Sequence, residues 1–589
     1  MHHKLSDILA TFLVILAPLI LTMSGCQSTP GSFNNPKDIQ SQNPAMLLAA
    51  ANQSKSPSRA ALLRLEAAEQ FLAQGDDTSA ANTLATLAFE NLNTDDTYRA
   101  RRLQAEIAIA QGDALTASQI LSTLPLSGAN DYILIAQACA ASNDHTCAAD
   151  GWIQASIALG MDSPELPANI HDQIWTHLNR ARSGPQVFSH RYHHAWWSLQ
   201  QKIRQAGSIT NQLSAWQNWQ AKNPSHPARL RPPAALTQLE HYRPPNIAVM
   251  LPLSGNLATA GEAVRDGIVA AFLEEQASDS TSISTDADST QVHFYDTANR
   301  PISQVWEAVL AGNHDVAVGP LLKNNVQSFA KVSGYSVMPR LSLNYLQEGS
   351  KKEDNETSNG LYQLGIAIED EARSLVTHML LAGYERIMMI HSDSSWSLRA
   401  RAAFLEQWPF PISTSSFADI KDLTAAVGDA MLTADSEARK TELQRILGTP
   451  LEFLPRARDD LEAIVALTTN VESQALVPAL RFHFGDHLPI YATSQAARSG
   501  RKDNIAGFNM TELPALTNDR FTDLNNTFDI QTSNFAELYA LGFDAFRVGT
   551  WLPLLSPDTQ MSLPGASGYL WLDNNGVIRR ELDLTTITR

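Results

Sequence analysis

The sequence predicts a multidomain protein, with all-α helical repeats first and an α/β bilobed region second. Two observations lead to this prediction. A short motif recurs in the first half at about the tetratricopeptide period, and strand-like and helix-like segments alternate in the second half. The 589 residues suffice for two to four domains of about 100–200 residues each.

The N-terminus is typical of a lipoprotein signal peptide, expected over residues 1–25. Residues 8–22 are almost wholly apolar but short for a membrane-spanning helix, and residues 23–26 (MSGC) resemble a lipobox with methionine where leucine is usual. We therefore expect lipidation at Cys26, with acyl and diacylglycerol groups there and no other cofactor. Gln27, rather than aspartate, favours the outer membrane, with the chain lipid-anchored on its periplasmic face. The alternative is a short membrane anchor with an incidental cysteine.

Residues 26–56 are rich in Gln, Ser, Asn and Pro, which predicts a lipidated flexible tether. The formal net charge of -18 argues against nucleic acid as a partner, since phosphate binding needs a basic surface. Three cysteines are too few for a disulfide scaffold or a zinc framework. In an oxidising compartment Cys139 and Cys147 form either a possible disulfide or two buried thiols.

Residues 57–230 carry the repeat. The motif at residues 74–76 (QGD) recurs at 111–113 (QGD) and, more loosely, at 142–144 (SND). An alanine follows each motif at the same distance, and apolar residues continue at helical spacing. Each unit is therefore predicted to be a tetratricopeptide-like helical hairpin, and a plain helical bundle is the alternative. The tryptophans of residues 196–219 are expected to close this helical region against the next domain.

The second half begins after a proline-rich linker, residues 231–245. Residues 246–589 alternate strands with helices and then restart the pattern, which predicts two α/β lobes in series with a cleft between them. The expected strands are residues 246–253, 292–295, 316–318, 340–343, 386–390, 463–467 and 489–492, with a hairpin at 569–572 and 577–582.

A solute-binding receptor of this architecture would hold its ligand in the cleft, near the ends of the strands. The candidate cleft or partner-surface residues at these ends are Ser254, Gly255, Asn256, Gly319, Ser392, Asp393, Thr493 and Ser494. The sequence does not indicate which of them would neutralise the charges of a ligand.

Several stretches resemble the LpoA family of lipoproteins, which activate class A penicillin-binding proteins. They are WWSLQQ (196–201), WQNWQAKNPSHPA (216–228), NIAVMLPLSGNLATAGEAVRDGIVAAF (246–272), VGPLLKNNV (318–326) and ALGFDAFRV (540–548). The resemblance implies tetratricopeptide-like helices followed by a type I periplasmic-binding-protein fold. It also implies a regulatory protein that reaches from the outer membrane towards peptidoglycan and stimulates transpeptidation by a bifunctional synthase.

Within the resembling stretch at 318–326, Lys323, Asn324 and Asn325 are either part of the synthase contact or the cap of a helix. No catalytic residue is expected, because the nucleophile-elbow, P-loop and zinc-protease motifs are absent. No metal site is expected either, and His483 and His487 are interpreted as a surface helix end. The alternatives to an activator are a periplasmic solute-binding receptor and a structural envelope adaptor that uses the helices.

Overall fold

The structure is a computed structural model, and it describes most of residues 43–588. The gaps are residues 126–127, 161–168, 182–183, 186–187, 189, 207, 280–288, 333–337, 347–359, 454–456, 499–502, 531–532, 556–561 and 574. The predicted signal peptide and Cys26 lie outside the described residues. The chain divides into two compact units, Met1–Leu103 and Gln104–Arg589, and each is described by itself. No helix in the described part is long and apolar enough to cross a membrane.

Each repeated motif forms the turn between two helices, as predicted. The helix pairs are α2 (Pro57–Ala73) with α3 (Asp77–Ala85), α4 (Thr94–Ala110) with α5 (Ala114–Ser122), and α6 (Ala129–Ala141) with α7 (His145–Leu159). Gly75, Gly112 and Asn143 each have a positive φ, which lets the chain reverse. Asp76 and Asp113 then accept a hydrogen bond from the backbone N–H three residues on, which caps the next helix.

The alanine after each motif is fully buried, at 0% exposure for Ala80, Ala117 and Ala148. A side chain this small lets the two helices of a hairpin approach closely. The structure therefore confirms the helical-repeat prediction, and it joins Cys139 of α6 to Cys147 of α7 by a disulfide.

Tryptophans dominate the core where the helical region ends. This core lies among α8 (Ile170–Arg180), α9 (Arg191–Gln205) and α10 (Ile209–Lys222). Trp196, Trp216 and Trp219 are at most 1% exposed. Trp551 of the α/β region packs against the same core, which confirms that the tryptophans close the helical region against the next domain.

Two segments that were predicted to lack helices contain short ones. The predicted tether 26–56 contains helix α1 (Pro44–Gln53), which Asn43 caps and whose Leu47 and Ala51 are buried. The predicted linker 231–245 contains helix α12 (Ala234–Gln238) and a 3-10 turn, η3 (Leu239–His241). Proline is tolerated just before a helix, where its missing N–H has no helical partner, so the proline pair precedes α12 rather than preventing it.

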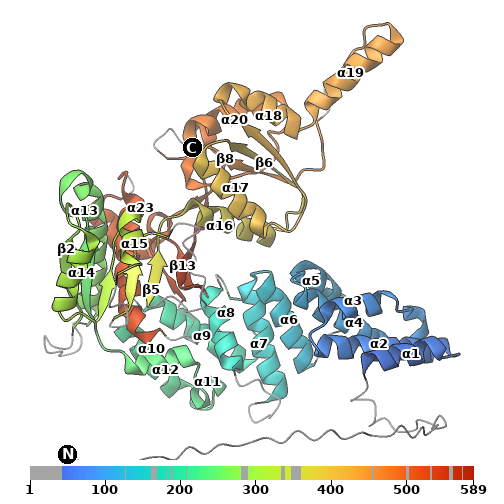
Figure 1. Cartoon of the computed structure of the whole chain (residues 1–589), viewed down its shortest axis with the longest axis horizontal. Helices are drawn as coiled ribbons and strands as arrows, with labels where there is room; N and C mark the ends of the chain where they lie inside the picture. Colours follow the sequence, from blue (N-terminus) through green and yellow to red (C-terminus); the bar gives the residue numbers. More distant parts are fainter. Residues whose placement is uncertain are drawn as a thin grey trace, which may run out of the picture. The chain divides into compact units, whose positions relative to one another are not determined.

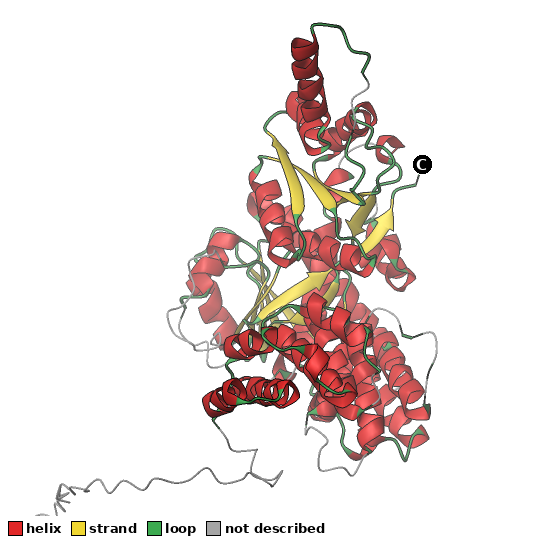
Figure 2. Ribbon diagram, turned by 90° about the vertical axis from the view of Figure 1, so that its right-hand side faces the viewer, coloured by secondary structure: helices red, strands yellow, loops and turns green. Residues whose placement is uncertain are grey.

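The α/β region has one sheet in each of two lobes, drawn as two separate sets of strands in Figure 2. The lobe 1 sheet has the order β11-β12-β13-β5-β4-β3-β1-β2, and the lobe 2 sheet has the order β14-β10-β9-β8-β6-β7. The lobe 1 strands are β1 (Asn246–Leu251), β2 (Gln291–Asp296), β3 (Val316–Val318), β4 (Arg340–Ser342), β5 (Leu361–Leu364), β11 (Ser562–Pro564), β12 (Tyr569–Leu572) and β13 (Val577–Glu581). The lobe 2 strands are β6 (Ile387–Ser392), β7 (Ile412–Phe417), β8 (Ala463–Leu467), β9 (Ile490–Ala492), β10 (Asn509–Glu512) and β14 (Asp583–Thr586).

The bilobed fold class is confirmed, but the lobes do not follow one another in series. The chain crosses from lobe 1 to lobe 2 after β5, returns after β10, and crosses again between β13 and β14. The predicted hairpin β12–β13 therefore extends the sheet of lobe 1, where β13 pairs in parallel with β5. A strand from a late part of the sequence can join an early sheet because sheet order need not follow chain order.

Helices cover both faces of each sheet. In lobe 1, α13 (Ala258–Asp279) and α23 (Ala536–Trp551) cover one face, and α14 (Ile302–Ala311) and α15 (Lys323–Phe329) cover the other. In lobe 2, α16 (Ile368–Leu381) and α17 (Ser395–Gln407) lie opposite α18 (Leu423–Ala430) and α20 (Asn470–Phe482). In lobe 1, α13 and α23 cross closely at Gly267 and Gly542, where an added Cβ would overlap the other helix's backbone.

The helical region is bonded directly to lobe 1. The guanidinium of Arg204 on α9 stacks 4.9 Å from the ring of Tyr569, and Arg180 of α8 lies 4.7 Å from the ring of Trp571. Arg520 of lobe 1 donates from Nη1 to the carbonyl oxygen of Arg204 at 3.0 Å. Burial lowers the pKa of Arg520 to about 10. These contacts tie helices α8–α9 to lobe 1.

Candidate functional site

The candidate site is the junction of the two lobes, where the carboxyl ends of the strands and the three crossings of the chain lie. Parallel strands bring their carboxyl ends to one edge of a sheet, where ligands of such folds bind. The residues predicted from the sequence divide between the two lobes.

In lobe 1, Ser254, Gly255 and Asn256 follow β1 and are exposed. The hydroxyl of Ser254 donates to Oδ2 of Asp296 at 2.6 Å, and the N–H of Leu253 donates to its other oxygen at 2.9 Å. Burial disfavours the charged form of Asp296, but these hydrogen bonds outweigh burial and lower its pKa. The polar group at the end of β1 therefore already has a partner at the end of β2.

Gly319 has a backbone role. Its φ is +100°, and an added Cβ would overlap the backbone carbonyl oxygen of Met250 on β1. Lys323 and Asn324, in the first turn of α15, are exposed, and Asn325 is half-buried. These three residues form the first turn of α15, but the N-cap position belongs to Leu322 and no side chain caps the helix there, so the capping alternative is wrong.

In lobe 2, Ser392 ends β6 and is 4% exposed, with its Oγ 2.8 Å from that of Ser394, while Asp393 is exposed. Thr493 follows β9 and is fully buried, and its Oγ1 has no hydrogen-bond partner among the described residues. Ser494 donates from its backbone N–H and its hydroxyl to the carboxylate of Glu371, at 2.7 and 2.9 Å.

Glu371 was not predicted, although it organises the strand ends of lobe 2. It lies in the first turn of α16, is 4% exposed, and also accepts a hydrogen bond from Thr511 Oγ1 of β10 at 2.7 Å. Burial raises the pKa of this carboxyl, and the bonds from Thr511 and Ser494 oppose the rise. Glu371 thereby ties the ends of β9 and β10 to α16.

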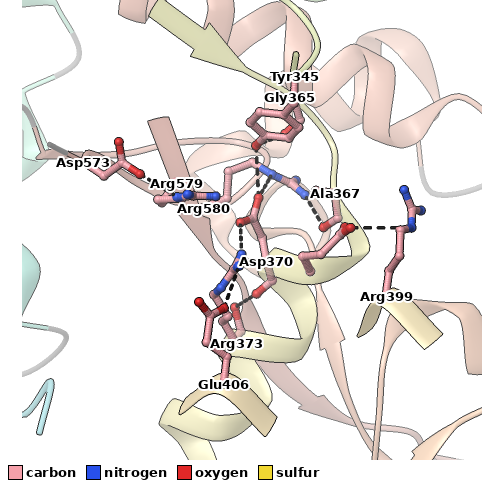
Figure 3. Close-up of polar contacts among 12 residues, drawn as sticks. Tyr345, Gly365, Ala367, Asp370, Arg373, Arg399, Glu406, Asp573, Arg579 and Arg580 are labelled. Atoms are coloured by element: carbon pink, nitrogen blue, oxygen red, sulfur yellow. Dashed lines mark hydrogen bonds and ion pairs between the residues drawn. The ribbon is translucent and has the colours of Figure 1, made fainter. Parts of the chain in front are cut away.

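A buried ion pair crosses from one lobe to the other (Figure 3). Arg580 of β13 and Asp370 of α16 are 2% and 1% exposed, and Nε lies 3.5 Å from Oδ2. Arg580 also donates to the carbonyl oxygens of Ser567 in lobe 1, at 3.0 Å, and Ala367 at the first crossing, at 3.4 Å. Burial raises the pKa of the Asp370 carboxyl, and the Arg580 guanidinium opposes that rise.

Tyr345 completes this network from the end of β4. Its hydroxyl lies 3.2 Å from Oδ2 of Asp370 and 3.1 Å from the carbonyl oxygen of Gly365 (Figure 3). Next to the network, Ser374 Oγ of α16 accepts a hydrogen bond from the N–H of Leu582 at the third crossing, at 3.0 Å. The network therefore fixes two crossings of the chain and with them the relation of the lobes.

The junction pairs its charges within the protein. Among the described residues, Ser254 and Ser494 are bonded to carboxylates of their own lobes rather than directed towards an open pocket. Two small cavities lie elsewhere, where the helical region meets lobe 1, and Gln212 and Trp551 line both. No group of three histidine, cysteine or acidic side chains that could hold a metal occurs in the part of the chain that the structure describes.

The family described as "LppC putative lipoprotein" matches residues 39–586. The chain belongs to the LppC lipoprotein family. The match covers the helical region and both lobes.

Curated relatives carry a name that describes their role. The chain is 25% identical over 446 residues to the "Penicillin-binding protein activator LpoA" of Vibrio cholerae, which covers 72% of each chain. The protein of the same name from Photobacterium profundum is 25% identical over 390 residues, covering 64% of this chain and 61% of the relative. The solved LpoA of Haemophilus influenzae matches with a TM-score of 0.51 at 20% identity, covering 93% of this chain and 96% of that one. At this identity the structural match concerns the fold.

Proposed function

We propose that this lipoprotein is a non-enzymatic activator that binds a class A penicillin-binding protein and stimulates its peptidoglycan transpeptidation. The observation that carries the proposal is membership of the LppC family from residue 39 to residue 586, together with relatives named penicillin-binding protein activators. The order of helical repeats followed by two α/β lobes supports it, because the H. influenzae LpoA has the same fold over nearly all of its length.

The activator acts by binding rather than by chemistry. A protein partner shifts a synthase towards a competent conformation only if it binds that conformation more tightly than the other. A lipoprotein with a fixed junction between its lobes suits this role, because a rigid surface loses little conformational freedom on binding. The buried pair Asp370–Arg580 and the Glu371 cluster supply that rigidity at the junction.

The proposed location is the periplasmic face of the outer membrane, with a lipid anchor on Cys26. The lipobox-like residues 23–26 and the lipoprotein family support it. Metabolic labelling with palmitate tests the anchor. The unmodified protein should incorporate label and Cys26→Ala should not, whereas equal labelling of both would refute the anchor at this position.

The decisive experiment for the function is reconstitution. Soluble protein starting at Gln27 is mixed with each class A synthase of the organism and with lipid-linked precursor, and the fraction of cross-linked peptides is quantified. A parallel reaction with the transpeptidase blocked by a penicillin separates cross-linking from glycan polymerisation. A rise in cross-linking with one synthase is expected, and no change with any synthase would refute the proposal.

A solute-binding receptor is the less supported reading. It would need polar groups free to receive a ligand at the strand ends, whereas Ser254 and Ser494 are already bonded to Asp296 and Glu371.

A further inference from the structure

Lobe 2 carries a helix that lies outside its core. Helix α19 (Thr433–Leu447) follows α18, and Figure 1 shows it extending away from α18 and α20. Thr433 and Ser436 in its first turn are 2% and 8% exposed, so the helix is packed only at its base. We call residues 432–453, which include α19 and the segment after it, the α19 arm.

The far end of the α19 arm displays an apolar stripe. Leu443, Ile446 and Leu447 are 50%, 66% and 58% exposed, and their spacing of three and four residues places them on one face of the helix. Phe453 is also exposed, and Lys440 lies over its ring at 5.2 Å. A stripe of this kind is normally buried against another element, whereas here none of the described elements buries it.

A second apolar group lies at the base of the arm. Leu432 and Phe484 both adopt a left-handed backbone, with φ of 56° and 61°, which disfavours bulky side chains. Their turns pack against each other, because Thr433 Oγ1 lies 2.6 Å from Nδ1 of His483. Both side chains are nevertheless about two-fifths exposed, at 40% and 41%, and neighbouring Phe482 is 69% exposed.

Strained backbone that presents apolar side chains to solvent does not serve the stability of the lobe. Residues held in sparsely populated conformations cluster at binding and switch sites, where the cost is offset by function. The base and the stripe therefore indicate, from independent observations, that one side of lobe 2 is shaped for contact with something outside this chain.

The charge of α19 identifies the kind of partner. The helix contains three acidic residues, Asp435, Glu437 and Glu442, and three basic residues, Arg439, Lys440 and Arg445. It is neutral although the whole chain has a formal net charge of -18. Nucleic acid and anionic membrane surfaces attract helices with a basic face, which α19 lacks. A neutral helix with an apolar stripe and charges of both signs beside it fits an apolar groove on another protein.

We propose that the α19 arm inserts into an apolar groove of the class A synthase and is the main docking element for it. This inference rests on the proposed function and adds the surface and the mode of binding to it. Leu443, Ile446 and Leu447 fill the groove as helix anchors, and Leu432, Phe482 and Phe484 extend the contact onto the body of lobe 2.

The first test replaces the stripe in the full mature lipoprotein with the triple substitution Leu443→Ala, Ile446→Ala and Leu447→Ala. Because these side chains are exposed, the fold should not change. The dissociation constant for the synthase should rise about 30–100-fold, since three half-exposed aliphatic anchors lose most of their buried area. The matched control is Leu230→Ala, Leu273→Ala and Leu381→Ala, whose side chains are 65%, 58% and 55% exposed on other surfaces. The control should bind like the unmodified protein.

The second test separates docking from misfolding. Asparagine tolerates the left-handed backbone better than leucine or phenylalanine. The double substitution Leu432→Asn and Phe484→Asn should therefore keep or raise the thermal midpoint while it weakens synthase binding about tenfold. Loss of affinity without loss of stability supports docking at the base of the arm.

The outcomes are distinguishable. If the unmodified protein binds and stimulates a synthase and both variants do the same, the docking inference is overturned and the proposed function stands. If the unmodified protein neither binds nor stimulates any synthase, the proposed function fails and this inference fails with it. If sedimentation shows a dimer that only the stripe variant abolishes, and synthase binding is unchanged, the occupant is a second copy and the inference is overturned.

Discussion

Acidification is expected to destabilise the helical region through two buried histidines, His145 of α7 and His177 of α8. Their Nδ1 atoms lie 3.0 Å apart, their rings stack at 5.2 Å, and each residue is 7% exposed. Burial, with help from the nearby Arg180 guanidinium, lowers the pKa of His145 to about 2 and that of His177 to about 4. Both side chains therefore stay neutral in the folded protein, and the contact between the two nitrogens requires one donor and one acceptor.

The direction in which pH changes the stability of the folded state follows from proton binding. A histidine whose pKa is lower in the folded state binds a proton on unfolding at pH values where a free histidine is charged. Its contribution to stability is therefore complete above about pH 6.5 and is lost as the pH falls towards the folded pKa. Lowering the pH from 7.5 to 5 should reduce the free energy of unfolding by about 2 kcal/mol for each histidine. For the pair the reduction should be roughly 2–4 kcal/mol, because the two titrations are coupled.

Hydrogen exchange followed by mass spectrometry measures this loss locally. After correction for intrinsic rates, amides of α7 and α8 should exchange about 30-fold faster or more at pH 5 than at pH 7.5, while amides of α23 provide an internal control. His177→Asn places an amide near the position of Nδ1 and cannot titrate, so it should reduce the pH dependence; the buried His171 of α8, whose pKa burial also lowers, retains part of it. An unchanged pH dependence in this variant, or equal acceleration in α23, would refute the reasoning.

Three further predictions concern stability. Gly542→Ala places a Cβ against the carbonyl oxygen of Val264 and should destabilise lobe 1 by about 2 kcal/mol in urea unfolding. The control Gly549→Ala meets only side-chain methyl groups, so it should lower the stability of lobe 1 by less. Arg580→Met removes the buried one of two cations that pair with Asp370, since Arg373 Nη1 also lies 3.6 Å from its Oδ1, and should cost about 3 kcal/mol, part of which Asp370→Asn restores in the double variant. Reduction of the disulfide Cys139–Cys147, whose cysteines are 8 residues apart, should lower the free energy of unfolding by about 2.5 kcal/mol, because the unfolded chain regains loop entropy. Faster amide hydrogen exchange confined to α6 and α7 would support this, and unchanged exchange would contradict it.

The elements that the sequence predicted well are those whose pattern is local. Strand β1 is a run of apolar residues because helices cover both of its faces, and β8 is predicted for the same reason. The turns of the repeat are predicted by glycine or asparagine followed by an aspartate cap. Such signals need no knowledge of distant parts of the chain.

The elements that were missed depend on distant partners. Strands β7 (Ile412–Phe417) and β10 (Asn509–Glu512) are short and polar, and only their pairing with β6, β9 and β14 makes them strands. Glu371 is followed by Thr511 only after 140 residues, so no spacing in the sequence links them. No spacing in the sequence links Asp370 to Arg580 either. The adjacent carboxylates Asp370 and Glu371 lie at the start of a helix, a position that usually indicates only a favourable interaction with the helix dipole.

The strands that lobe 1 takes from the end of the chain determine when its sheet can be completed during folding. Strands β11, β12 and β13 complete a sheet that begins at β1, and β14 then closes the edge of the other sheet. While the chain folds, β5 and β10 therefore keep open edges until the last few dozen residues have joined the two sheets. Contacts this distant in sequence make the final assembly slow. A chain truncated near residue 560 would therefore expose an unpaired sheet edge in each lobe, which should make both lobes prone to aggregation.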